Sequence, residues 1–135
     1  MDAAAQKQRA LAFLDQMNHP DAGVLAGLIA DDFEFEFMMR APGVKVQKRD
    51  QFLKWFPKIM KSWFPNGLNM KFDTVVAEGP HVAVQARADT IAGNGKHYNN
   101  RYHFFLRFEG GRIAQAREYN DTNHVRETFF PEQPV

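Results

Sequence analysis

The fold is decided by residues 82–121, which read VAVQARADTIAGNGKHYNNRYHFFLRFEGGRIAQAREYND. The first part alternates apolar and polar side chains up to Ile91, as a half-buried β-strand does. Asn94-Gly95 follows, and both residues tolerate the positive φ angles of a tight type I′ turn. Gly110-Gly111 is a second turn signal, flanked by alternating segments at 98–109 and 113–119. The stretch therefore predicts three antiparallel strands joined by two tight hairpins.

The turn lengths predict which side chains lie opposite one another. If each turn has two residues, Asp89 faces Asn100, and Asn100 faces Asp121 on the next strand. The adjacent row on the same face of the sheet then contains Arg87, Tyr102 and Tyr119. The outer members of such a row are roughly 10 Å apart between backbones, which leaves room for a small molecule. The alignment predicts a polar patch in which one acid stays ionised while a more buried one keeps its proton.

The same residues also have a purely structural interpretation. Arg87 and Asp89 would form an ion pair, and Asp121 would cap whatever follows the last strand. An Arg-x-Asp pair alone is a weak functional signal, and only the shared alignment with the amide and the two phenols favours a site. Both interpretations are compatible with the sequence.

Composition limits the possible classes of function. The chain has 135 residues, 44% of them hydrophobic, which suits one domain with a real core. The formal net charge is +1 and the basic residues are scattered, so we expect neither a nucleic-acid partner nor a membrane partner. The sequence has no cysteine, which excludes disulfides and thiol chemistry. No signal-peptide pattern or membrane-spanning segment is visible, and we expect a cytoplasmic protein.

Neither a metal nor another cofactor is expected. No two histidines stand with a carboxylate at a spacing typical of metal ligands. Both glycine-rich segments are hairpin turns rather than phosphate-binding loops, because no helix follows them. The unusual feature of the composition is 13 Phe with 2 Trp and 6 Met, which could line an apolar cavity or simply pack the core.

Helical periodicity appears in three places. Apolar side chains at positions 10, 13, 14 and 17 predict a helix that ends before Pro20. A second helix is expected to begin at Pro20-Asp21. A third is expected from about Arg49, and Pro57 should kink it or end it early.

Two further segments alternate as strands. Residues 33–39 place aromatic side chains on one face, and Ala41-Pro42-Gly43 should end this strand. Residues 70–76 form the second, which should end at Gly79-Pro80. The order of elements predicts a single α+β domain over residues 1–135, in which N-terminal helices cover the concave face of a cone-shaped, curved antiparallel sheet.

The other face of the sheet is then left uncovered. With two-residue turns, this face mixes small apolar and polar side chains, a composition that suits sheet-to-sheet dimerisation. The sequence therefore predicts a homodimer through a face formed by Val82, Val84, Ala86, Ala88, Arg101, His103, Phe105, Arg107 and Glu118.

Three motifs resemble the nuclear transport factor 2-like superfamily, specifically its SnoaL-like and ketosteroid-isomerase-related members. They are Leu28-Ile29-Ala30-Asp31-Asp32, the segment 102–108 before Gly111-Arg112-Ile113, and Arg117-Glu118-Tyr119-Asn120-Asp121-Thr122. The resemblance covers nearly the whole chain and implies the cone-shaped fold. It is weak for activity, because this fold hosts many chemistries and some pure binders.

Within the superfamily, Arg87-x-Asp89 with Asp121 is similar to the Asp-Arg-Asp set of limonene-1,2-epoxide hydrolase. The similarity implies that the carboxylates activate water and protonate an epoxide oxygen. The hydrolase also has a Tyr and an Asn on its first strand, where this chain has Phe35 and Phe37. The ketosteroid isomerase pattern departs at the same place, because Phe37 stands where the carboxylate base is implied.

Together these observations predict a pocket for a small apolar or aromatic molecule and cofactor-free acid–base chemistry, such as isomerisation, cyclisation or epoxide hydration. Asp121 is the expected leading acid or base, Asp89 its partner and Arg87 the orienting cation. The expected substrate-binding residues are Asn100, Tyr102, Tyr119, Phe35, Phe37, Trp55, Phe56 and Phe104. Two alternatives remain, namely a non-catalytic ligand-binding protein and a dimerisation module with a vestigial cavity.

Overall fold

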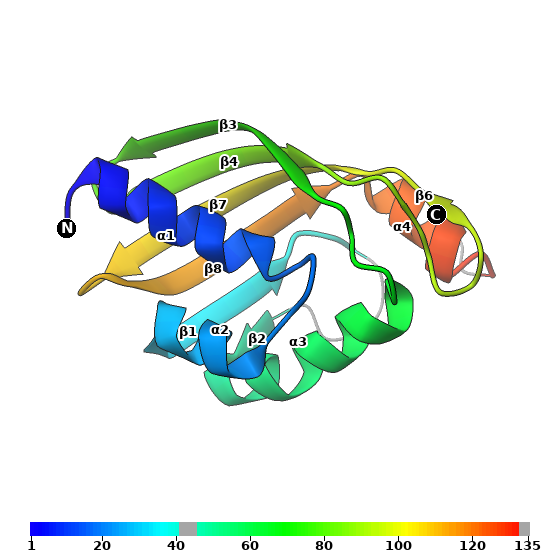
Figure 1. The fold of residues 1–135 in the computed structure, drawn as a ribbon, viewed down its shortest axis with the longest axis horizontal. Helices are drawn as coiled ribbons and strands as arrows, with labels where there is room; N and C mark the ends of the chain where they lie inside the picture. Colours follow the sequence, from blue (N-terminus) through cyan, green and yellow to red (C-terminus); the bar gives the residue numbers. More distant parts are fainter. Residues whose placement is uncertain (41–45, 133–135) are drawn as a thin grey trace.

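The computed structural model of the chain describes residues 1–40 and 46–132. Within these residues, six strands form one curved sheet in the order β2-β1-β8-β7-β4-β3 (Figure 1). The predicted antiparallel meander is present as the neighbours β3, β4, β7 and β8. β1 extends it on the other side by pairing in parallel with β8. The bounds are β1 Ile29–Phe37, β2 Val46–Lys48, β3 Lys71–Glu78, β4 His81–Arg87, β7 Arg101–Glu109 and β8 Arg112–Asn120. The expected end of β1 at Ala41-Pro42-Gly43 lies outside the described residues.

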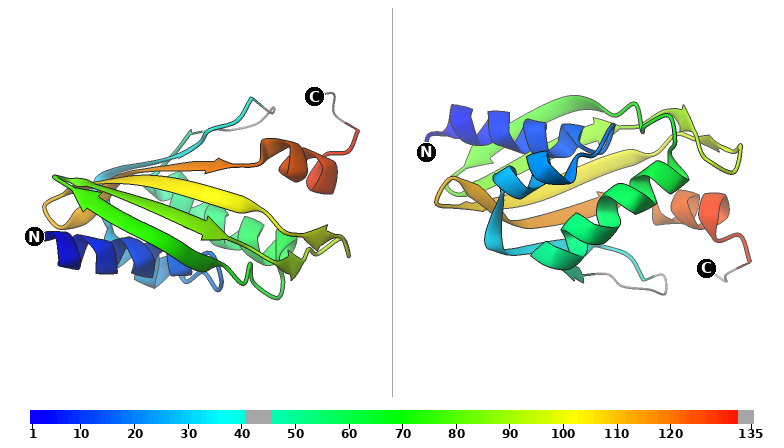
Figure 2. Two further views of the ribbon diagram at one scale, coloured as in Figure 1. Left: turned by 90° about the horizontal axis from the view of Figure 1, so that it is seen from above. Right: turned by 60° about the horizontal axis from the view of Figure 1, so that its bottom comes forward.

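Helices cover one face of this sheet, as predicted. α1 (Ala3–Asp15), α2 (Ala22–Leu28) and α3 (Arg49–Trp63) lie together in front of the strands in the right-hand view of Figure 2. Asp21 caps α2 by accepting hydrogen bonds from two backbone amides. Pro57 lies inside α3, so it does not end the helix. The structure also contains two elements that the sequence did not predict. They are the strand β2 and the helix α4 (Thr122–Phe129), which follows β8 directly.

An aromatic cluster joins the helices to the sheet. Phe52 of α3 is fully buried and packs against four other rings, with centroid distances of 4.6 to 6.0 Å. The partners are Phe13 of α1, Phe33 and Phe35 of β1, and Phe56 of α3. The five phenylalanines of this cluster therefore pack the core.

The first hairpin has a longer turn than the sequence predicts. The strand expected over 82–91 is interrupted after Arg87, and the hairpin tip is a separate pair, β5 (Thr90–Ile91) and β6 (His97–Tyr98). Ala92 donates its amide hydrogen bond to Lys96, which leaves a three-residue turn with Gly95 at a positive φ of 85°. The turn begins at Gly93, whose backbone amide donates a hydrogen bond to the Trp63 carbonyl. A Cβ atom at this position would collide with the Ser62 carbonyl. The extra turn residue moves the register of β4 against β7 by one.

The second hairpin turns at Gly110-Gly111 as predicted, with both residues at positive φ. Just beyond the turn, however, β8 contains a β-bulge. Phe108 pairs with Ile113 and Arg107 with Gln115, so Ala114 is an extra residue. From that point the register differs by one from the prediction, and every later β8 side chain points to the opposite face.

These two shifts exchange the faces of β4 and β8 relative to the prediction. Val82, Val84, Ala86, Ala88 and Glu118, which were expected on the outer face, are buried on the inner face. The outer face instead presents the half-buried Ala83 and His103 beside the exposed Phe105, Tyr119 and Gln85. Dimerisation through this face stays a prediction, and the molecular mass from sedimentation equilibrium at micromolar concentration tests it.

We expect Phe52→Ala to lower the free energy of unfolding by about 3–5 kcal/mol, because it empties the centre of the aromatic cluster. The control is Phe105→Ala, whose ring is 37% exposed on the outer face and whose loss should cost about 1 kcal/mol or less. Urea unfolding curves of the two variants give both values. Equal losses in the two variants would contradict the position of Phe52 in the core.

Candidate functional site

A cavity of about 400 Å³ lies between the inner face of the sheet, α3 and α4. This volume is within the range of small-molecule binding pockets. Its wall is mainly aromatic and thioether side chains, so water inside it has few partners. The apolar lining comprises Met17, Phe37, Met39, Trp55, Phe56, Ile59, Met60, Trp63, Phe64, Leu68, Val125, Phe129 and Phe130.

A few polar side chains converge on this apolar wall. Glu118 and Asn120 enter from β8, Tyr98 from β6 and Tyr102 from β7, with Gln47 of β2 at another part of the lining. Glu118 and Asn120 reach the cavity because the bulge at Ala114 turns them inward. A cavity of this kind, apolar with a small convergent polar group, is the usual form of a ligand-binding site.

Glu118 is the acidic side chain of the cavity. The residue is only 8% exposed, and burial raises the pKa of its carboxyl group from 4.5 to about 7. Asn120 opposes this rise in part, because its Nδ2 donates a 2.8 Å hydrogen bond to Oε2 of Glu118. The carboxyl group can therefore both accept and release a proton near neutral pH.

Two phenols form a hydrogen-bonded pair in the same cavity. The hydroxyl oxygens of Tyr98 and Tyr102 are 2.5 Å apart. The pair has two hydroxyl protons and uses one of them internally, which leaves one for a ligand. Burial raises the pKa of both phenols, and the charge of Glu118 raises them further, so both stay protonated at physiological pH. The tyrosine pair can thus donate a hydrogen bond to an oxygen atom that becomes negatively charged.

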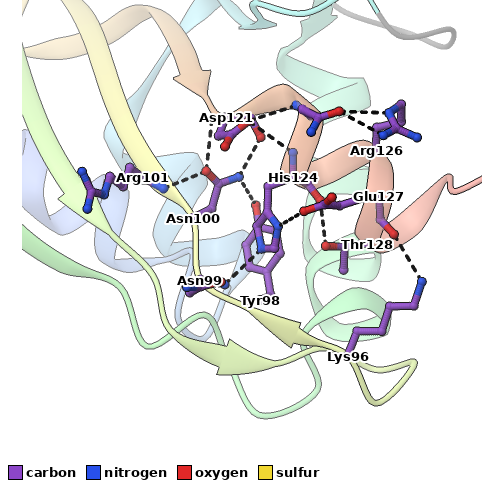
Figure 3. Close-up of polar contacts among 11 residues, drawn as sticks. Lys96, Tyr98, Asn99, Asn100, Arg101, Asp121, His124, Arg126, Glu127 and Thr128 are labelled. Atoms are coloured by element: carbon purple, nitrogen blue, oxygen red, sulfur yellow. Dashed lines mark hydrogen bonds and ion pairs between the residues drawn. The ribbon is translucent and has the colours of Figure 1, made fainter. Parts of the chain in front are cut away.

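Asn100 holds the tyrosine pair in place. Its side chain is 2% exposed, and its Nδ2 donates to the Tyr98 hydroxyl at 2.9 Å and to the Asp121 carbonyl at 3.2 Å. Its Oδ1 accepts from the backbone amides of Arg101 at 2.7 Å and Asp121 at 3.1 Å. Figure 3 shows this amide between the start of β7 and the end of β8. Asn100 is therefore a fully hydrogen-bonded support of the site.

α4 closes one side of the cavity. Asp121 caps this helix by accepting hydrogen bonds from the amides of Asn123 and His124 (Figure 3). The His124 ring stacks on Tyr98 at 5.1 Å, accepts a hydrogen bond from the Asn99 amide through Nε2 and contacts Glu127 through Nδ1. The helix thus fixes the Tyr98 ring through His124.

The three residues expected to be catalytic do not meet in the cavity, and the predicted row of Asp89, Asn100 and Asp121 is wrong. The Asp89 side chain is 72% exposed and its carboxylate contacts His97 at 2.7 Å. Arg87 is 59% exposed and pairs with Asp73 at 3.1 Å. The third residue, Asp121, is exposed and caps α4, as the structural interpretation expects. The longer first turn and the bulge in β8 are the physical causes.

The expected substrate-binding residues divide into two groups. Those that line the cavity are Phe37, Trp55, Phe56 and Tyr102. The other four do not line the cavity. Phe35 and Phe104 are fully buried in the core, and Asn100 supports Tyr98. Tyr119 is on the outer face near the His103 ring.

Sequence reasoning missed Glu118, Asn120 and Tyr98 as cavity residues. One signal was available on β4, where the apolar side chains of Val82 and Val84 mark the buried face. The bulge itself has no clear sequence signature, since Ile113 and Ala114 are both small or apolar and both buried.

In residues 1–40 and 46–132, no cluster of three or more His, Asp or Glu side chains could hold a metal ion. No helix in the same part of the chain is long and apolar enough to cross a membrane.

The sequence and the fold were compared with known proteins. A family model described as SnoaL-like domain matches residues 10–116, which end just before Glu118. No curated protein sequence matches this chain significantly.

Solved structures with the same fold include three with informative descriptions. One is a protein from Jannaschia sp. CCS1 whose description provisionally assigns it as a SnoaL-like polyketide cyclase. It has a TM-score of 0.77 and 17% identity over 98% of this chain and 95% of that chain. An LEH-like epoxide hydrolase from M. tuberculosis has a TM-score of 0.75 and 16% identity over 96% and 92%. A hypothetical protein with a ketosteroid isomerase-like fold from Catenulispora acidiphila, in complex with trimethylamine, has a TM-score of 0.73 and 16% identity over 90% and 91%. At these identities the likeness shows the fold alone.

We expect Glu118→Gln to stabilise the protein in a pH-dependent manner. The pKa of Glu118 is higher in the folded protein than in the unfolded chain, so the folded protein binds the proton more tightly. The free energy of unfolding therefore falls as the pH rises from about 4.5 to about 7. Ionised Glu118 then costs about 3 kcal/mol above pH 7, a cost that glutamine does not have. Urea unfolding at pH 4.5 and pH 8 should show a higher free energy of unfolding for the variant than for the wild type, mainly at pH 8. The same difference at both pH values would contradict the buried, titrating carboxyl group.

Proposed function

Because the chain belongs to the family of SnoaL-like domains, we propose that it is a cofactor-free acid–base enzyme acting on a small apolar or aromatic substrate. The observation that carries the proposal is Glu118, a carboxyl group with a pKa of about 7 inside an apolar cavity that also contains a pair of phenols.

Glu118 would act as the base. Its ionised carboxylate takes a proton from a carbon next to a carbonyl group, and the electron pair of that C–H bond moves onto the carbonyl oxygen. The spare hydroxyl proton of the Tyr98–Tyr102 pair donates a hydrogen bond to this oxygen. Return of the proton from Glu118 to another carbon completes an isomerisation. Attack of the enolate carbon on a second carbonyl forms a C–C bond and an alkoxide, and transfer of the proton from Glu118 to this alkoxide completes a cyclisation. Neither outcome changes the oxidation state overall.

The cavity wall supports the choice of substrate class. Flat aromatic rings such as Trp55, Phe56 and Phe37 favour a flat, conjugated molecule, whose carbonyl then lies near the polar residues. Epoxide hydration is less well supported, because Arg87, Asp89 and Asp121 lie outside the cavity and are engaged by Asp73, His97 and the first turn of α4.

The competing proposal is a ligand-binding protein without turnover. The same apolar wall would hold a ligand without any proton transfer, and Glu118 and the phenols would only anchor its polar group. The two proposals differ in whether the bound molecule exchanges protons.

The test is proton exchange and isomerisation of cyclic β,γ-unsaturated ketones and aromatic polyketone analogues in D₂O, followed by NMR. We expect Glu118→Gln to lower the catalysed rate at least about 100-fold, and Tyr102→Phe about 10-fold or more. The matched controls are Asp121→Asn and Tyr119→Phe, which should change the rate less than about threefold because neither side chain reaches the cavity. Ligand-induced thermal stabilisation without exchange across the panel would favour the binding protein.

The pH dependence is a second expected outcome. The value of kcat/KM should rise with pH around a midpoint near 7, as Glu118 of the free enzyme loses its proton. It should then stay level through pH 9, because the raised pKa of Tyr98 and Tyr102 keeps the donor protonated. A profile that falls between pH 6 and 8 would exclude Glu118 as the base.

A further inference from the structure

A second depression, of about 450 Å³, lies where β3, β4 and β7 come together near the first hairpin. It is separate from the apolar cavity, and its lining is polar. Arg87 and Asp89 both line this depression. The buried amide of Asn100 is part of its lining.

Three cations cross the sheet side by side in this depression. Lys71 of β3 pairs with Arg87 of β4, and Arg87 pairs with Arg101 of β7. Adjacent strands are about 4.8 Å apart, so the outer two backbones are roughly 10 Å apart. We call Lys71, Arg87 and Arg101 the cationic row. Like charges directly opposite one another destabilise a sheet, and the cationic row contains two such pairs.

Nearby acids compensate the cationic row only in part. Asp73 contacts Nε of Arg87 at 3.1 Å, which leaves the two terminal nitrogens of that guanidinium without a hydrogen-bond partner among residues 1–40 and 46–132. Asp89 is engaged by His97. In the same part of the chain, no carboxylate lies within 4.0 Å of the side-chain nitrogens of Lys71 or Arg101. Figure 3 shows the Arg101 side chain extending away from Asp121 and α4.

We propose that the cationic row binds a phosphorylated small molecule. Guanidinium groups bind phosphate oxygens through paired hydrogen bonds, and a lysine adds a point charge at the end of the row. Three cationic side chains on neighbouring strands carry more positive charge than a single carboxylate neutralises, and they match the several negative charges of a diphosphate. The occupant is small, because the depression has a volume of about 450 Å³.

The test titrates sodium pyrophosphate into ¹⁵N-labelled protein at constant ionic strength, with chloride as the compensating anion. We expect saturable shifts of backbone amides confined to the segments around Lys71, Arg87 and Arg101. Citrate, a multiply charged carboxylate, should bind at least about tenfold more weakly than pyrophosphate. Shifts that do not saturate, shifts spread over the surface, or equal binding of citrate would each overturn the proposal.

Two variants complete the test. Arg101→Gln and Lys71→Gln should each weaken pyrophosphate binding about tenfold or more, because each removes a charged hydrogen-bond donor. The control, Lys61→Gln on the exposed side of α3, should leave binding unchanged. Without ligand and at low salt, Arg101→Gln should raise Tm, since it removes one repulsive contact of the row. Unchanged pyrophosphate affinity in both variants would show that the cationic row is not the site.

Discussion

The extra residue in β8 is the constraint on which the cavity depends. Side chains alternate between the faces of a strand, so one inserted residue exchanges the faces of everything that follows it. With Ala114 in the bulge, Glu118 and Asn120 point inward, and Tyr119 and Asp121 point outward. The bulge thus decides which carboxyl group is buried, and with it the acid–base character of the site.

The two polar parts of the cavity influence each other. Burial keeps Glu118 close to half-protonated near neutral pH, and its charge in turn makes the phenols of Tyr98 and Tyr102 harder to ionise. In the proposed reaction, the base and the hydrogen-bond donor are therefore present together above about pH 7. Because the Asn100 amide donates a hydrogen bond to the Tyr98 hydroxyl, the phenol pair would need little reorganisation in the proposed reaction.

The sequence predicts the elements of this fold better than their register. Helical periodicity locates α1, and the alternation of β3, β4, β7 and β8 predicts the meander. Register depends on turn length, and the first turn contains three residues because Gly93 packs against the end of α3, a tertiary contact that local sequence does not encode. The aromatic lining was predicted in part, through Phe37, Trp55, Phe56 and Tyr102, because alternation and helical spacing identify those faces without knowledge of register.

The parallel pairing of β1 with β8 has a consequence for how the chain acquires this structure. Ile29 pairs with Ile113, so a strand near the beginning of the chain finds its neighbour only after most of the polypeptide has been synthesised. Until then the edge of β1 that pairs with β8 has no partner strand, and an open edge of this kind favours aggregation. The cavity, whose walls include Phe37 in the first third of the sequence and Phe129 near its end, is consequently among the last parts of the molecule to form.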